Sequence, residues 1–247
     1  MHNRRWIIGV VAGLLLVSAA TYIVHYLIFH DAHHIFVYMV EDIAFIPIEV
    51  LLVALVIERL LARREKRAKL QKLNMVIGTF FSELGTQLLG QLTDGIRDKD
   101  EVRPHLNVSA DWAAADFKKA LAAEGQQDYV IDLDRIDLAA LQERLAKHRD
   151  LLVMLLGNPN LLEHERFTDL LWAVFHLMEE LSARGDLSAL PDTDRAHIAG
   201  DIRRVYSHLT VEWLHYCEHL QGAYPYIFSV VTRTHPLQEQ PDPVVRS

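Results

Sequence analysis

Histidine and glutamate side chains recur at helical spacing near residues 208–219. His208, Glu212, His215 and His219 are separated by four, three and four positions, so on an α-helix they would form one stripe. Two histidines at i and i+4 can chelate one metal ion, and a Glu-x-x-His pair is used in carboxylate-bridged helical bundles. The spacing therefore predicts a divalent metal site on Glu212, His215 and His219.

The His215-x-x-x-His219 segment resembles the metal-binding helix of DinB-like bundles, and the resemblance covers this one helix. It implies ligands from other helices, and the available types are Glu83, His176, Glu179 and Glu180. The alternative is that the stripe is a solvated boundary and that His176 is a hydrogen-bonded core histidine. The core face expected beside the stripe consists of Ile198, Ile202, Val205, Leu209, Trp213, Tyr216 and Leu220.

Arg203 and His208 have the spacing of the RNA-cleaving motif of HEPN domains. An arginine there would stabilise developing phosphate charge while the histidine moves a proton. At i and i+5 the two side chains do not share a helix face. The net charge of −8 also opposes nucleic-acid binding, which needs a basic surface. We therefore expect no nucleic-acid partner, assign no catalytic residue and favour a non-enzymatic function.

A second set of chemistry-bearing residues lies inside an apolar part of the chain. Residues 6–29 contain no Asp, Glu, Lys or Arg, and a helix of that length spans roughly 36 Å, enough for a hydrocarbon core of about 30 Å. A second apolar run, residues 35–57, is interrupted by charged residues and a proline. We predict a transmembrane hairpin over residues 1–61, with its two spans at about 6–29 and 35–57.

Basic residues flank this hairpin but are absent from its turn. Arg4 and Arg5 precede the first run, and the positive-inside rule places such flanks in the cytoplasm. We predict a two-span protein of the cell inner membrane with both termini cytoplasmic. The alternative of a cleavable signal peptide is disfavoured, because the apolar run continues past Ala20. The basic residues after the second run are Arg59, Arg63, Arg64, Lys66, Arg67 and Lys69.

The acidic residues of the second run share one helix face: at 100° per residue around the helix axis, they fall within about 80° of the direction of His34. A charged carboxylate at mid-bilayer costs about 2.5–3.5 kcal/mol, so such side chains face partners or water. Our leading hypothesis is a path that conducts or senses protons or cations. Because two helices cannot enclose a pore, it requires a homo-oligomer. The alternative is that the acids pair with histidines and only lock the hairpin. The path residues are His25, Glu41, Asp42 and Glu49.

The turn of the hairpin is rich in metal-ligand types. His30, Asp31, His33 and His34 would suit zinc or copper, which gives a further interpretation as a metal-sensing turn. None of these patterns requires a cofactor. A divalent metal is the one cofactor that they allow.

The remaining chain predicts an all-α fold: a juxtamembrane basic and amphipathic helix at 62–95, a cytoplasmic bundle at 96–235 and a disordered tail at 236–247. The bundle should hold roughly five or six helices. Residues 128–132 could form a short strand, for which we find no partner. The single cysteine excludes an intrachain disulfide and fits a reducing cytoplasm.

Two alternatives for the cytoplasmic part remain open. Leu70, Leu73, Ile77, Phe80 and Leu84 keep three-four spacing, typical of a face that packs either on its own domain or between protomers. The protein could also be a membrane-tethered scaffold whose bundle binds a cytoplasmic protein partner.

Overall fold

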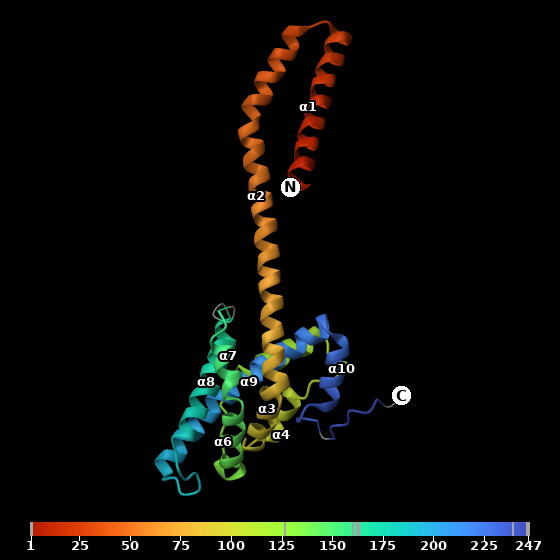
Figure 1. Cartoon of the computed structure of the whole chain (residues 1–247). Helices are drawn as coiled ribbons and strands as arrows, with labels where there is room; N and C mark the ends of the chain where they lie inside the picture. Colours follow the sequence, from red (N-terminus) through yellow and green to blue (C-terminus); the bar gives the residue numbers. More distant parts are fainter. Residues whose placement is uncertain (1, 126, 160, 162–163, 239, 246–247) are drawn as a thin grey trace. The chain divides into compact units, whose positions relative to one another are not determined.

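The computed structural model describes residues 2–125, 127–159, 161, 164–238 and 240–245, with backbone only at 2–5, 7 and 65–72 (Figure 1). The fold is all-α, as predicted. The chain divides into two compact units, Met1–Lys66 and Arg67–Ser247.

Two helices make up the first unit. They are α1 (His2–Phe29) and the first part of α2 (Ala32–Phe80), a helix that continues into the second unit. His30 takes a positive φ of 49° between them. Asp31 then begins α2 by accepting a hydrogen bond from the backbone N–H of His34, at 3.1 Å. Such an Asp cap satisfies a donor that the first helical turn leaves unpaired.

Among the described helices, one passes a length and composition test for crossing a membrane. The segment Ile8–Phe29 of α1 passes, and none of it is buried. A soluble core helix or a signal sequence would pass the same test. The apolar run of α2 is interrupted by Glu41, Asp42 and Glu49 and followed directly by Glu58 and Arg59, and these charges together are the reason that it does not pass. The two-span hairpin therefore stays a prediction, with one candidate span supported.

The core of the second unit begins with the last turns of α2, which lead into a π-helical turn, η1 (Phe81–Gly85), and then into α3 (Thr86–Asp94). Leu73, Ile77, Phe80 and Leu84 are all buried in the core of this unit. These residues at three-four spacing therefore pack within the chain, which favours a face that packs on its own domain over one that pairs protomers. The side chain of Leu70 lies outside the described residues.

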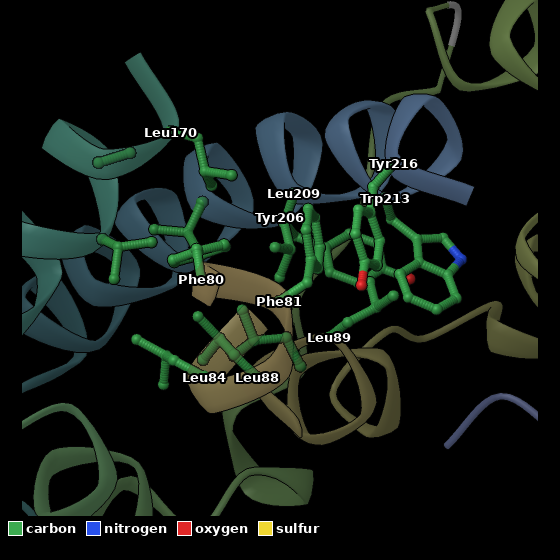
Figure 2. Packing of buried hydrophobic residues seen from close by; sticks show 14 of the residues in the cluster. Phe80, Phe81, Leu84, Leu88, Leu89, Leu170, Tyr206, Leu209, Trp213 and Tyr216 are labelled. Carbon is green, nitrogen blue, oxygen red and sulfur yellow. The ribbon is translucent and has the colours of Figure 1, made fainter. Parts of the chain in front are cut away.

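At the π-helical turn η1, two consecutive phenylalanines, Phe80 and Phe81, lie in the core. The rings of Phe80 and Phe81 are edge to face, 5.3 Å apart, and Phe81 stacks on Tyr216 at 4.7 Å (Figure 2). A Cβ atom at Gly85 would lie 2.5 Å from the Phe80 ring, so this close approach requires glycine. Single π-turns inside helices often mark functional or strained positions; here the turn serves packing.

The bundle continues through short helices and then two long ones. Residues 95–108 carry charges and Pro104, a pattern that predicts a linker, but helix α4 lies within this segment. Asp137 as an N-cap and the Gly157 break predict one helix from Asp137 to Leu156; in the structure it is broken at His148, whose Nδ1 lies 2.8 Å from the carbonyl oxygen of Arg144. The elements are α4 (Lys99–Leu106), α5 (Ala114–Glu124), the 3-10 turn η2 (Leu133–Arg135), α6 (Leu138–Lys147), α7 (Arg149–Leu156), α8 (Glu165–Ser182), α9 (Asp192–Ala223) and α10 (Pro225–Thr234).

Helix α9 is the axis of the second unit, and it packs against α3, α4, α5, α8 and α10. Its predicted core face is buried throughout. Helix α8 begins with His164, whose Nδ1 accepts from the Phe167 N–H at 3.1 Å. The spacing of Asn160 and Glu163 predicts a capping box at the start of this helix, and both residues lie outside the described part of the chain.

Two irregular segments differ from expectation. The segment 128–132 does find a partner: Ile131 forms an isolated antiparallel bridge with Ile96. Disorder was predicted from residue 236 onward. In the structure Leu237 is 1% exposed, and its carbonyl oxygen accepts a hydrogen bond from Arg103 Nε at 2.9 Å.

Candidate functional site

Two histidines and two carboxylates meet where α8 packs against α9, and we call them the α8–α9 cluster. His176 and Glu180 are one turn apart on α8, and His197 and Asp201 are one turn apart on α9. His176 Nε2 lies 3.5 Å from Asp201 Oδ2 and 3.9 Å from Glu180 Oε1. His197 Nε2 lies 3.4 Å from Asp201 Oδ2 and also 3.4 Å from Glu180 Oε2.

Asp201 is the buried member of the cluster, with 4% of its side chain exposed. Its Oδ1 accepts a hydrogen bond from Arg204 Nη1 at 3.0 Å. Its Oδ2 is buried and has no hydrogen-bond partner among the described residues. The imidazoles of His176 and His197 are 45% and 51% exposed. A buried carboxylate oxygen thus faces two imidazoles that are about half exposed.

Arg184 holds Glu180 in place. Its guanidinium forms ion pairs with Glu180 at 2.7 Å and with Asp194 at 2.6 Å. The hydrogen bonds from Arg184 keep the pKa of both carboxyl groups below their usual values, because they favour the charged form. Glu180 is therefore ionised at neutral pH and available as an oxygen ligand.

The sequence patterns did not predict this cluster. They singled out His176 as a core histidine or a spare ligand and Glu180 as a spare ligand, and they did not single out His197 or Asp201. The available signal was a histidine followed four residues later by a carboxylate on each of two consecutive helices. His176 instead lies at the edge of the α8–α9 contact.

The predicted metal stripe farther along α9 has a different environment. Glu212 is 2% exposed, and burial raises its pKa to about 7 even though Arg166 opposes the shift. Arg166 Nε lies 3.3 Å from Glu212 Oε1, and Arg166 Nη1 lies 2.9 Å from His215 Nε2. We call these three residues the Arg166 cluster.

The Arg166 cluster leaves few free ligand atoms for a metal ion. A guanidinium has only donors, so the Nε2 lone pair of His215 accepts from Arg166 instead of binding a cation. His219 contacts a different residue: its Nδ1 atom lies 3.1 Å from Nδ2 of Asn74. Within the described chain, the ligand-type group found is His176, His197 and Asp201, whose ligand atoms lie within 4.8 Å of one another. The site on Glu212, His215 and His219 stays an untested prediction that Arg166 disfavours.

The first unit brings together part of the predicted ion path. The rings of His25 and His34 stack 6.0 Å apart with an interplanar angle of 4°. They line a hollow of about 350 Å³, the hairpin pocket. The Nδ1 atom of His25 is buried without a hydrogen-bond partner among the described residues. Glu41 and Glu49 do not line this pocket. Its lining residues are Thr21, Tyr22, His25, His34, Ile35, Tyr38 and Asp42.

The turn histidines are engaged separately. The ring of His30 faces Tyr26 at 6.2 Å, while His34 stacks on His25 and Asp31 caps α2. Neither these residues nor His33 belong to the ligand-type group found in the described chain. The turn thus gives no structural support for the predicted metal set.

The HEPN-like pair is also not assembled. Arg203 Nη1 bonds Asp128 Oδ1 at 3.1 Å. No described contact joins Arg203 to His208, so the structure brings no phosphate-cleaving pair together in this chain.

The fold and these sites define an all-α protein with an N-terminal helical pair followed by a helical bundle. Residues 69–233 match the family model "Uncharacterized protein MJ1433, C-terminal helical domain", and residues 2–61 match "MJ1433, N-terminal helical domain". The chain therefore belongs to the MJ1433 family. It is 41% identical over 240 residues to "Uncharacterized protein MJ1433" of Methanocaldococcus jannaschii, covering 97% of this chain and 96% of that protein. No solved structure gives a significant match.

Proposed function

We propose that this is an integral membrane protein whose residues 6–57 cross the bilayer twice and carry the helical bundle on the cytoplasmic side. The observation that carries the proposal is the exposure of the apolar side chains in the first unit. Apart from Ile35, the described large apolar residues of α1 and of α2 up to Leu61 are 36–71% exposed. Soluble proteins rarely expose continuous apolar surface on this scale, whereas lipid solvates it. The basic flanks favour cytoplasmic termini.

The second span is the demanding part of this proposal, because a carboxylate in the hydrocarbon core needs a partner. Asp42 lines the hairpin pocket with His25 and His34, so it has imidazole neighbours within one chain. Glu41 and Glu49 have no such neighbour in the described hairpin. A homo-oligomer would supply polar surroundings for both, and we include it in the proposal.

Single cysteines can test the topology, because the native Cys217 is 0% exposed and gives an unreactive background. His33→Cys reports the turn, and Val244→Cys reports the C-terminal side. In intact spheroplasts a membrane-impermeant maleimide should label residue 33 and not residue 244, and lysis should expose residue 244. Labelling of residue 244 before lysis, no labelling of residue 33, or a chain found in the soluble fraction would overturn the proposal. The measured mass of the purified protein should include the first helix, which shows that this helix is not removed as a signal peptide.

A second function is favoured by the unpartnered Nδ1 atom of His25, a residue that lines the hairpin pocket together with Asp42. We propose that the hairpin pocket binds a proton or a small cation within the membrane and that oligomers conduct or sense it. Vesicles containing the protein should show proton or cation flux that falls at least tenfold in Asp42→Asn. Glu49→Gln should also lower the flux, whereas Glu58→Gln, beyond the span, should not. A wild-type protein without flux, or a monomer in detergent, would contradict this function.

A further inference from the structure

We propose that the α8–α9 cluster is a binding site for a divalent transition-metal ion of the zinc class. His176, His197 and Asp201 are the principal ligands, and Glu180 is the fourth. The site lies in the second unit and uses none of Glu212, His215 and His219, the metal set predicted from the sequence, although His176 and Glu180 were among the additional ligands considered for that set. It goes beyond the membrane proposal and does not depend on it.

The spacing between the Asp201 oxygen and the two histidine nitrogens fits neighbouring ligands of one tetrahedral ion. Zinc binds histidine nitrogen at about 2.0–2.1 Å and carboxylate oxygen at about 2.0–2.2 Å, so neighbouring ligand atoms in a tetrahedron lie roughly 3.3–3.5 Å apart. Asp201 Oδ2 lies 3.4 Å from His197 Nε2 and 3.5 Å from His176 Nε2, as expected for neighbouring ligands of one ion. Glu180 approaches the two histidines through different oxygen atoms, Oε2 at 3.4 Å from His197 Nε2 and Oε1 at 3.9 Å from His176 Nε2. An ion placed among these atoms would therefore require small side-chain movements.

The Oδ2 atom of Asp201 points to a ligand independently of the spacing. Buried polar atoms nearly always have a hydrogen-bond partner, and this one has none in the described chain. It lies 3.4 and 3.5 Å from the two imidazole Nε2 atoms, yet neither nitrogen makes a hydrogen bond to it. An ion would bond this oxygen and both nitrogens together.

The surroundings hold the two carboxylates in position. Arg204 occupies Oδ1 of Asp201 and leaves Oδ2 directed at the histidines. Arg184 bonds Oε2 of Glu180, so Glu180 is the weaker ligand and Oε1 is its freer oxygen. Such outer contacts orient metal-binding carboxylates. Two imidazoles with one or two carboxylates favour zinc-class ions over magnesium or calcium, which prefer oxygen ligands alone.

Full-length protein in detergent, purified without a polyhistidine tag and stripped with a chelator, provides the test. Equilibrium dialysis against Zn²⁺ with elemental analysis should give one bound ion per chain. His176→Gln and His197→Gln should each weaken binding at least tenfold. Both side chains are about half exposed, so these variants should fold, which circular dichroism verifies. The matched controls His215→Gln and His33→Gln should bind as the wild type does.

Co²⁺ gives a second measurement, because its absorption spectrum reports tetrahedral coordination. A tetrahedral spectrum that is lost in His197→Gln supports the site. Three results would overturn it: no stoichiometric zinc in the wild type, zinc binding that both cluster variants retain, or binding lost in His215→Gln or His33→Gln instead.

Discussion

Helix α9 carries two clusters of acid and histidine that differ in what α8 brings to them. In each, a carboxylate of α9 is almost fully buried: Asp201 is 3% exposed and Glu212 is 2% exposed. Helix α8 supplies His176 and Glu180 to the first and Arg166 to the second. The same residue types on one helix therefore form a set of metal ligands in one place and a charge pair in the other.

The difference shows how much the facing helix decides. Arg166 approaches Glu212 Oε1 directly, at 3.3 Å, and brings a fixed positive charge to the position where a cation would bind. Arg204 approaches Asp201 through the other oxygen, Oδ1, so the oxygen that faces the histidines stays open. A cation is therefore repelled from the Arg166 cluster and accepted by the α8–α9 cluster.

The largest expected effect concerns the pH dependence of Glu212. Its pKa is raised from 4.5 to about 7 by burial, so between these values the folded chain binds a proton that the unfolded chain has lost. Glu212 therefore lowers the free energy of unfolding as pH rises from 4.5 to 7, by on the order of 3 kcal/mol at about 1.4 kcal/mol per pKa unit. Glu212→Gln should remove this slope.

Thermal or denaturant unfolding of both proteins at several pH values measures that difference. Burial also lowers the pKa of His235 to about 4, which gives a slope of opposite sign between pH 4 and 6.5. His235 is present in both proteins, so its contribution cancels on subtraction. Parallel pH curves for the wild type and Glu212→Gln would show that Glu212 is not protonated on folding.

The second expected effect is stabilisation by zinc at the α8–α9 cluster alone. An ion at about 100 times its Kd stabilises a folded protein by about 2.7 kcal/mol, which raises Tm by roughly 5–10 °C for a domain of this size. The wild type and Glu212→Gln should both show the increase, and His197→Gln should not. If Glu212→Gln lost the increase instead, the roles of the two clusters would be reversed.

The third effect tests whether Arg184 positions Glu180. Outer contacts of metal ligands are worth about 10- to 100-fold in affinity, and Glu180 is the weaker ligand, so Arg184→Gln should weaken zinc binding about tenfold. Arg203→Gln is the matched control, because Arg203 is on α9 and pairs with Asp128 outside the cluster. An unchanged Kd for Arg184→Gln, measured by the same dialysis, would remove Glu180 from the ligand set.

The comparison also explains what the sequence could predict. Spacing along α9 gave its core face correctly, because burial on one face follows the helical period. It could not show which residues α8 places opposite that face. Glu212 was assigned to a metal stripe because Arg166 is 46 positions earlier in the sequence, and Asp201 was missed because it lies beside an apolar face. The break at His148 and the burial of Leu237 likewise depend on tertiary contacts.

The smallest expected effect is that of removing Arg166 at acidic pH. At pH 5.5 Glu212 is protonated in the folded protein, because its pKa is about 7, so Arg166 faces a neutral carboxyl group. Arg166 is also 55% exposed, and exposed ion pairs contribute about 0–1 kcal/mol. Arg166→Met should therefore cost less than about 1 kcal/mol in the free energy of unfolding at pH 5.5, and more at pH 8. A loss at pH 5.5 as large as that at pH 8 would mean that Arg166 acts through packing of its stem, and that the charge difference between the two clusters is not what separates them.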